Sequence, residues 1–243
     1  MADSSYTLPA LDQDFLLGNS MRGVRFLLEY EKAEETLQAH GVRSTIVVFG
    51  SARVAEDGPC LQSHWYAEAR RFGALASTRG GALTLVDGQR NNVIATGGGP
   101  GLMAAANRGA HDVGAPTIGF NISLPEEQVP NPFTTPELTF QFHYFAMRKM
   151  HLAMRARALV VFPGGFGTLD ELFEVLTLAQ TRKLQRFPVV LFDSAYWRRI
   201  IDLEALVAEN MIDPADLALF DWAETADEIW ERLVARWSEA PAR

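Results

Sequence analysis

The sequence predicts an α/β protein: a doubly wound, Rossmann-like parallel sheet with helices on both faces. Short apolar runs typical of strands buried on both faces alternate with helical stretches along the whole chain. Three of these runs end in turns of glycine and other small residues, where a strand leads into a helix. Because no repeat or interdomain linker interrupts this pattern, we expect residues 21–243 to form one domain behind a loose arm of residues 1–20.

In chain order, the first helix precedes the first strand, and strands and helices then mostly alternate; the strands 117–120 and 138–142 are joined by a loop, and two helices end the chain. The expected strands are 45–49, 93–96, 117–120, 138–142, 158–162 and 187–192. The expected helices cover about 21–40, 61–77, 102–113, 146–157, 169–179, 195–209 and 224–237. Two longer connections remain: residues 78–91, which can include a short hairpin, and the proline-rich loop 124–136, a length typical of functional loops.

The stretch Pro163-Gly164-Gly165-Phe166-Gly167-Thr168-Leu169-Asp170-Glu171 links the buried strand 158–162 to a helix. Its glycines allow the backbone to come close to a ligand. The free N–H groups at the start of the following helix favour an anion, typically a phosphate. The stretch also has a structural interpretation, because Thr168-x-x-Glu171 matches a capping box, with two acids in the first turn of the helix.

A second glycine-rich turn, Gly97-Gly98-Gly99-Pro100-Gly101, follows the strand 93–96, and Pro100 fits the first helical position. It is not a Walker A loop, because no Gly-Lys-Ser/Thr follows. It also departs from the dinucleotide fingerprint, since Leu102 replaces the third glycine and the next strand runs into Asn121 instead of an acid. The sequence therefore disfavours NAD. The turn after the first strand, with Gly50 and Ser51, is by itself compatible with an ordinary connection.

Topology is expected to bring these turns to one edge of the sheet, where ligands bind in doubly wound folds. The helix 146–157 must return antiparallel to the strands, so its start, with Arg148, lies at the same edge as Glu171. Arg148 can pair with phosphate or another ligand oxygen, although a solvated residue or an ion pair is the alternative. Met147 and Lys149 flank it and are candidate binding residues, with Lys149 about 100° around the helix.

Met147-Arg148-Lys149 followed by the stretch 163–171 resembles the signature of the Lonely Guy (LOG) family, often labelled lysine decarboxylase-like. That signature is Pro-Gly-Gly-x-Gly-Thr-x-x-Glu with an Arg-Lys pair upstream. Residues 97–103 resemble the second glycine motif of the family, and the resemblance extends over roughly 45–210. The N-terminal helix and the extended loops are similar to the longer subgroup.

The resemblance implies a nucleoside 5′-monophosphate phosphoribohydrolase, which releases a free base and ribose 5-phosphate from a cytokinin ribotide or AMP. It implies no cofactor, a homodimer or higher assembly, and Arg148 and Glu171 as the catalytic pair. A carboxylate beside C1′ would stabilise the oxocarbenium-like transition state and orient or deprotonate the attacking water. The candidate substrate-binding residues are Gly50, Ser51, Gly97, Gly98, Gly99, Gly101, Met147, Lys149, Gly164, Gly165, Gly167 and Thr168.

Two other functions share these motifs. Lysine decarboxylase activity would require pyridoxal phosphate and a Schiff-base lysine, but Lys32, Lys149 and Lys183 all lie outside the glycine turns. A non-enzymatic carrier of a nucleotide or of the molybdenum cofactor would use the same fold and turns for binding alone. A carrier has no need of Arg148 and Glu171, so their pairing favours the hydrolase.

Composition excludes several classes of protein. A net charge of −8 without a basic block argues against nucleic-acid binding. No apolar run reaches the roughly 18 residues of a membrane span, and the N-terminus lacks the features of a signal peptide. Cys60 is the only cysteine, which together with these features indicates the cytoplasm. The histidines are scattered, so we expect no metal site.

Overall fold

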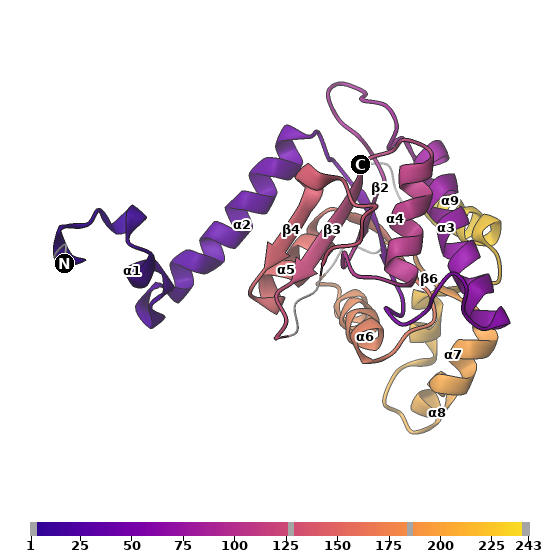
Figure 1. Cartoon of the computed structure of the whole chain (residues 1–243). Coiled ribbons are helices and arrows are strands. Elements are labelled where there is room, and N and C mark those ends of the chain that lie inside the picture. The colour runs from indigo at the N-terminus through magenta and orange to yellow at the C-terminus, as the bar shows by residue number, and fades with distance from the viewer. Residues whose placement is uncertain (1–3, 126–128, 184–186, 240–243) are drawn as a thin grey trace.

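Seven strands form one sheet in the order β4-β3-β2-β1-β5-β6-β7, and every neighbouring pair is parallel. The computed structural model in Figure 1 describes residues 4–125, 129–183 and 187–239. The strands are β1 (Thr45–Phe49), β2 (Val93–Thr96), β3 (Thr117–Ile122), β4 (Thr139–Phe142), β5 (Ala156–Val161), β6 (Val189–Phe192) and β7 (Asp221–Ala223). The doubly wound, Rossmann-like parallel sheet predicted from the sequence is confirmed.

Helices cover both faces of this sheet (Figure 1). They are α1 (Gln13–Leu17), α2 (Arg22–Ala39), α3 (Cys60–Gly80), α4 (Leu102–Asp112), α5 (Phe145–Met154), α6 (Phe166–Gln180), α7 (Ser194–Ile200), α8 (Leu203–Ala208) and α9 (Ala226–Glu239). Helix α3 packs against α4 and α9 on one face, and α5 packs against α2 on the other. On that second face α5 and α6 line an apolar cavity above β1 and β5.

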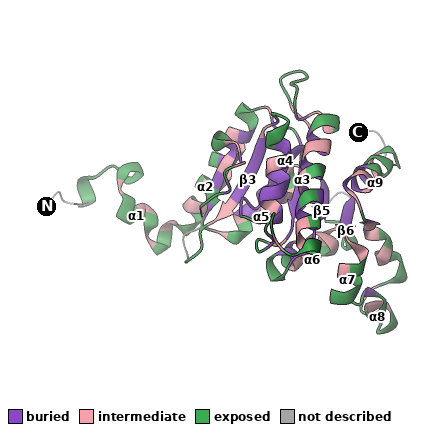
Figure 2. Cartoon of the chain, turned by 45° about the vertical axis from the view of Figure 1, so that its right-hand side comes forward, coloured by how far each residue is buried: buried purple, intermediate pink, exposed green. Residues whose placement is uncertain are grey.

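The central strands form the core, which Figure 2 shows as a buried sheet between helices with exposed outer faces. Every residue of β1, β2 and β6 is buried, because helices cover both sides of these strands. Strand β4, at the edge, alternates instead: Phe140 and Phe142 are buried while Gln141 is exposed. The period-two pattern at 138–142 correctly predicted a strand, and the sheet order shows that this strand lies at the edge.

Glycines allow α3 and α4 to touch along their backbones. A Cβ at Gly73 would lie 2.1 Å from the carbonyl oxygen of Ala106, and one at Gly109 would lie 1.8 Å from that of Arg70. No side chain fits in either place, so the two helices can cross only at these glycines. Because α4 begins directly after Gly101, this contact also fixes the second glycine turn.

Several element boundaries differ from the sequence expectations. The expected helix 146–157 ends at Met154, because Ala156 already pairs with Thr45 in the sheet. The expected helix 195–209 is two helices, since the Asp202 carboxylate accepts a hydrogen bond from the Ala205 N–H and begins α8. The three residues of β7 were too short a run to predict.

The other connections agree better with expectation. Helix α3 continues to Gly80 and ends at Gly81, whose φ of +93° stops it. The hairpin in the following connection exists as a single bridge, Val86 to Gln89, over a turn in which Asp87 and Gly88 have positive φ. The proline-rich loop 124–136 lies partly outside the described residues, which omit 126–128.

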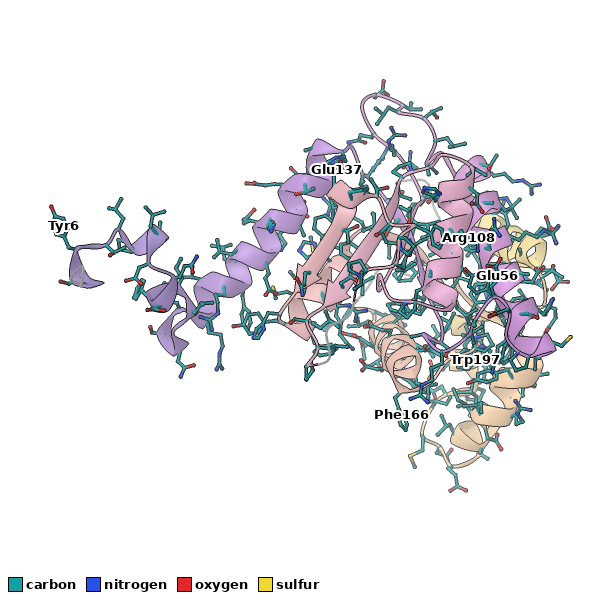
Figure 3. All side chains as sticks on the ribbon, in the orientation of Figure 1. Tyr6, Glu56, Arg108, Glu137, Phe166 and Trp197 are labelled. Atoms are coloured by element: carbon teal, nitrogen blue, oxygen red, sulfur yellow. The ribbon has the colours of Figure 1, made fainter. Side chains whose placement is uncertain are left out.

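Residues 4–20, the described part of the expected loose arm 1–20, consist of α1 and short 3₁₀ turns that project away from the sheet (Figures 1 and 3). Most of their side chains are exposed, including Tyr6 at 93%. The division into a loose arm and a domain of residues 21–243 stays a prediction. Within the described part of the chain, no helix combines the length and apolar character that a membrane span requires.

Candidate active site

Three glycine-containing turns meet at the carboxyl edge of the sheet. They follow β1, β2 and β5, which are neighbours in the sheet. The Ser51 N–H donates to the Pro163 carbonyl (2.9 Å), and the Leu102 N–H donates to the Ser51 carbonyl (3.0 Å). The turn after β1 is thus hydrogen-bonded to both others. Strand order reverses between β1 and β5, which is the topological switch point where ligands bind in open α/β sheets.

The close packing of these turns requires glycine at two positions. A Cβ at Gly50 would lie 2.7 Å from the Cβ of Leu102, and one at Gly101 would lie 2.2 Å from the Ser51 carbonyl oxygen. Gly101 also has a φ of +71° and is the N-cap of α4. The expectation that Pro100 occupies the first helical position is therefore wrong, because the left-handed turn at Gly101 separates it from the helix.

Arg148 and Glu171 lie together at this edge and are both buried, with 9% and 5% of their surfaces exposed. The Arg148 Nη1 is 3.4 Å from the Glu171 Oε1, and the Arg148 Nε donates to the carbonyl of Phe120 at 2.7 Å. The guanidinium also lies against Gly97, where a Cβ would be 2.4 Å from Nη2. A strand carbonyl, an acid and a glycine therefore determine the position of this cation.

Burial makes both charges costly and shifts their titration. Desolvation raises the pKa of Glu171 to about 6, although the positive charges of Arg148 and Lys149 oppose this. Desolvation also lowers the pKa of Arg148, while Glu171 and Asp170 act to raise it. A carboxylate that titrates close to neutral pH and lies beside a fixed cation is suited to acid–base chemistry or to stabilising a developing positive charge.

The capping box expected at Thr168 and Glu171 is not formed. Helix α6 starts at Phe166 after an N-cap at Gly165, so Glu171 and Asp170 lie beyond its first turn. No side chain caps this helix. Thr168 instead packs over Gly164, where a Cβ would lie 2.1 Å from its Oγ1. The extended backbone of Gly165 lets the chain enter the helix earlier than expected, which leaves the Glu171 carboxylate for Arg148.

The residues beside the signature acid and arginine occupy different surroundings. Lys149 forms ion pairs with Asp170 (2.8 Å) and Glu174 (2.7 Å), so it links α5 to α6. Met147 is partly buried against the core. Gly165 and Gly167 are exposed, and a Cβ on either would meet nothing within 4 Å, so there is open space beside the start of α6.

Phe166, between these two glycines, is 92% exposed and extends outward from the start of α6 (Figure 3). The side chains of the stretch 163–171 therefore differ in burial. Thr168 and Glu171 are buried in the site, whereas Phe166 faces solvent at its rim.

An amide network beneath the second glycine turn was missed by the sequence analysis. Asn107, completely buried in α4, accepts hydrogen bonds from Thr96 Oγ1 (2.7 Å) and Asn131 Nδ2 (3.1 Å). It donates to the hydroxyl of Thr117 and to the carbonyl of Ile118. A lone asparagine in an alanine-rich helical stretch was the only available signal.

The same network holds the glycine turn directly. The Asn131 N–H donates to the Gly98 carbonyl (2.9 Å), and its Nδ2 donates to the Gly99 carbonyl (3.1 Å). The Gly98 N–H donates to Thr96 Oγ1 at 2.9 Å. Because Asn131 belongs to the proline-rich loop, this loop and the glycine turn form one unit.

Two further contacts position the site. The Tyr196 hydroxyl donates to the Gly164 carbonyl at 2.8 Å and so restrains the third turn. The Glu29 carboxylate of α2 accepts from the backbone N–H groups of His143 (2.9 Å) and Tyr144 (3.3 Å), immediately before α5 begins. Helix α2 therefore supports the start of α5, the helix that carries Arg148.

The part of the chain that the structure describes offers no set of side chains for a resident metal and no lysine for pyridoxal phosphate. The described residues contain no group of three or more His, Cys, Asp or Glu side chains arranged for a metal ion. Lys149 is held between two acids, and Lys32 and Lys183 are exposed outside the glycine turns. No lysine in the described residues is placed to form a Schiff base beside a phosphate-binding turn.

This geometry defines a Rossmann-like α/β protein with a buried carboxylate–guanidinium pair at the switch point of its sheet. The family model described as "Possible lysine decarboxylase" matches residues 103–233, more than half of the chain, so the chain belongs to that family. The matched region contains both halves of the signature that resembles the LOG family.

Curated relatives carry a more specific name. "Probable cytokinin riboside 5'-monophosphate phosphoribohydrolase LOG4" of Oryza sativa subsp. japonica is 31% identical over 146 residues, which is 58% of this chain and 62% of the relative. "Cytokinin riboside 5'-monophosphate phosphoribohydrolase LOG3" of Arabidopsis thaliana is 32% identical over 150 residues, covering 59% and 67%. The match therefore spans only about three fifths of the length of the rice LOG4 and LOGL5 relatives, at 62% and 58%.

Solved structures share the fold. The structural-genomics target TM1055 is similar with a TM-score of 0.55 at 21% identity, over 77% of this chain and 96% of that one. The molybdenum cofactor binding protein of the phototrophic bacterium Rippkaea orientalis gives a TM-score of 0.52 at 19% identity, over 79% and 96%. At these identities the likeness establishes the fold alone.

Proposed function

We propose that this protein is a phosphoribohydrolase that cleaves the N-glycosidic bond of a nucleoside 5′-monophosphate, giving free base and ribose 5-phosphate. The observation that carries the proposal is the buried Arg148–Glu171 pair at the meeting point of three glycine-containing turns. The names of the curated relatives support the same reaction.

The turns account for nucleotide binding. The N–H groups of Phe166 and Gly167, the first two of α6, have no partner within the helix and lie beside the open space at Gly165 and Gly167, whereas the Thr168 N–H donates to the Gly165 carbonyl. They form a site suited to a phosphate, and the helix dipole favours its charge. The net charge of −8 does not oppose this, because the binding groups are local backbone dipoles.

Glu171 and Arg148 account for the chemistry. As the N-glycosidic bond breaks, its electron pair leaves with the base and positive charge develops on the ribose ring. The ionised Glu171 carboxylate stabilises that charge and takes a proton from the water that attacks C1′. The proton finally binds the nitrogen of the base that was bonded to C1′, which gives the neutral free base. Arg148 holds the Glu171 carboxylate and binds a ligand oxygen in place.

The substrates we propose are a cytokinin ribotide and AMP, because the curated relatives are named for the former and both have the same bond. The test incubates the protein separately with AMP and with isopentenyladenosine 5′-monophosphate, without added cofactor, and quantifies the free base by chromatography. We expect base release from both, and its loss in Glu171→Gln, which keeps the shape of the side chain but not its charge.

Glu174→Gln is the matched control. Glu174 lies on the same helix, pairs with Lys149 and is more exposed than Glu171, so this variant should keep base release. If the wild type binds nucleotide but releases no base, the hydrolase proposal is wrong. A carrier function, which would use the same turns for binding alone, then replaces it.

We also infer a homo-oligomer that works in the cytoplasm. Apolar side chains of the N-terminal segment and α2 are exposed, among them Leu11 (72%), Leu17 (69%), Leu27 (56%) and Leu28 (53%). Contact with a second copy would cover them. Light scattering coupled to size-exclusion chromatography tests this inference, and a mass of one chain at all concentrations would contradict it.

A further inference from the structure

Asn121 lies at the carboxyl end of β3, immediately beside the second glycine turn. A Cβ on Gly98 would lie 2.4 Å from both Oδ1 and Nδ2 of Asn121, so the amide packs against the bare α-carbon of a glycine whose φ is +70°. The residue before it, Phe120, supplies the carbonyl that accepts from Arg148 Nε. Asn121 is therefore adjacent to both the glycine turn and the group that holds the catalytic arginine.

The orientation of the Asn121 amide is fixed. Its Nδ2 donates to the carbonyls of Phe140 (3.2 Å) and Gly119 (3.4 Å). Two carbonyl acceptors require the amide nitrogen on that side, so the oxygen faces the other way. Within the described residues no donor is hydrogen-bonded to this Oδ1. Because the residue is only half-buried, the edge of the sheet presents one oriented acceptor beside the second glycine turn.

The place of Asn121 in the fold indicates what this acceptor binds. In dinucleotide-binding folds of this topology, the strand after the glycine-rich turn and its helix ends in an acid, which binds a ribose hydroxyl. In this chain the glycine turn after β2 leads through α4 to β3, and Asn121 stands near the end of that strand. An amide oxygen keeps the ability to accept from a hydroxyl.

The absence of a charge at this position also has a physical reason. An acid on the residue after Phe120 would bring a second anion close to Arg148, in competition with Glu171. It would also repel the phosphate of a nucleotide bound at the neighbouring turns. A neutral acceptor avoids both effects.

We propose that the Asn121 Oδ1 accepts a hydrogen bond from a ribose hydroxyl of the nucleotide, which makes this residue a determinant of ribonucleotide over deoxyribonucleotide preference. The proposal rests on the proposed phosphoribohydrolase function and adds to it a residue that contacts the sugar.

The test removes the ribose hydroxyl with deoxynucleotides and the Asn121 amide by substitution, first separately and then together. kcat/KM is measured for AMP, 2′-deoxy-AMP and 3′-deoxy-AMP with the wild type, Asn121→Ala and Asn121→Ser. We expect the wild type to prefer AMP over one of the two analogues by about three- to tenfold, the effect of one neutral hydrogen bond. In both variants that ratio should fall to about one, while the ratio for the other analogue stays unchanged.

Gln141→Ala is the matched control, since Gln141 is an exposed amide at the register position beside Asn121, one strand further from the glycine turn. It should keep both wild-type ratios. Each ratio compares substrates on one protein sample, so a partly folded variant does not alter it.

Wild-type ratios that persist in Asn121→Ala and Asn121→Ser would overturn the proposal, as would a wild type that accepts all three nucleotides equally. Failure of the proposed function has a different signature, because the wild type would then release no adenine from AMP. In that case dissociation constants for the three nucleotides, measured by calorimetry, replace kcat/KM in the same comparison. A wild type that binds none of them overturns both proposals.

Discussion

Gly97→Ala tests whether the position of the Arg148 guanidinium controls the reaction. A Cβ at Gly97 would lie 2.4 Å from Arg148 Nη2, whereas ordinary contacts begin at 3.4 Å, so the guanidinium must withdraw by the difference of about 1 Å. A displacement of about 1 Å in a catalytic arrangement lowers the rate about 100-fold. We expect kcat for AMP hydrolysis to fall by about that factor, equivalent to about 2.7 kcal/mol in activation free energy.

The same substitution should leave the fold intact. The guanidinium is the flexible end of a long side chain, and the φ of Gly97 lies outside the left-handed region, so alanine is tolerated by the backbone. Base release measured by chromatography and thermal unfolding measured by circular dichroism separate the two effects. A folded Gly97→Ala protein with the wild-type kcat would refute the role given to Arg148.

Gly23→Ala is the control for a glycine substitution as such. Gly23 lies in α2, has no atom within 4 Å of its added Cβ and has an ordinary helical φ. Alanine there should leave kcat unchanged and raise the free energy of unfolding by about 0.5–1 kcal/mol, because glycine weakens a helix interior.

Three further predictions concern pH and stability. Burial raises the pKa of Glu171 to about 6 in the free protein, and the proposed reaction needs the ionised form. The value of kcat/KM, which reports the free enzyme, should therefore fall about tenfold per pH unit below that pKa, and a flat profile between about pH 5 and 8 would contradict this. Asn107→Ala removes four hydrogen bonds from a completely buried position. The free energy of unfolding, measured by urea denaturation, should therefore fall by about 2–4 kcal/mol. An unchanged denaturation midpoint would show that the network does not stabilise the fold. Gly109→Ala places a Cβ 1.8 Å from a carbonyl oxygen of α3, so the melting temperature should drop by many degrees. An unchanged melting temperature would show that α3 and α4 can move apart without loss of stability.

Strands and glycine turns were predictable because local sequence determines them. A run such as Thr45–Phe49 is apolar from Ile46 onward and buried at every position, so it has no stable place outside a sheet covered on both faces. Glycines followed by a helical pattern identify a strand-to-helix turn, and the parallel topology then places Arg148 and Glu171 at one edge. Boundaries were less predictable: Gly165 allowed α6 to begin before Thr168, so the pattern of a capping box was present without its hydrogen bonds.

The residues that support the turns were not predictable from spacing. Asn107 and Asn131 are separated in sequence, and each alone is compatible with an ordinary helix or loop position. Tyr196 and Glu29 likewise reach the site from elements on either side of the signature region. Their contacts depend on how α2, α4 and α7 pack, which no local pattern describes.

The sequence by itself determined the fold class, the three turns and the two charged residues of the site, because each follows from periodicity, glycine content or the direction of a parallel sheet. Only the tertiary structure decided which groups touch. It paired Arg148 with Glu171 and Lys149 with Asp170 and Glu174. It also placed the Asn121 oxygen beside Gly98 without a hydrogen-bond donor among the described residues. The physical reason is that burial and hydrogen bonding arise between elements distant in the chain, and a difference of about an ångström in their packing decides the partner of each polar group.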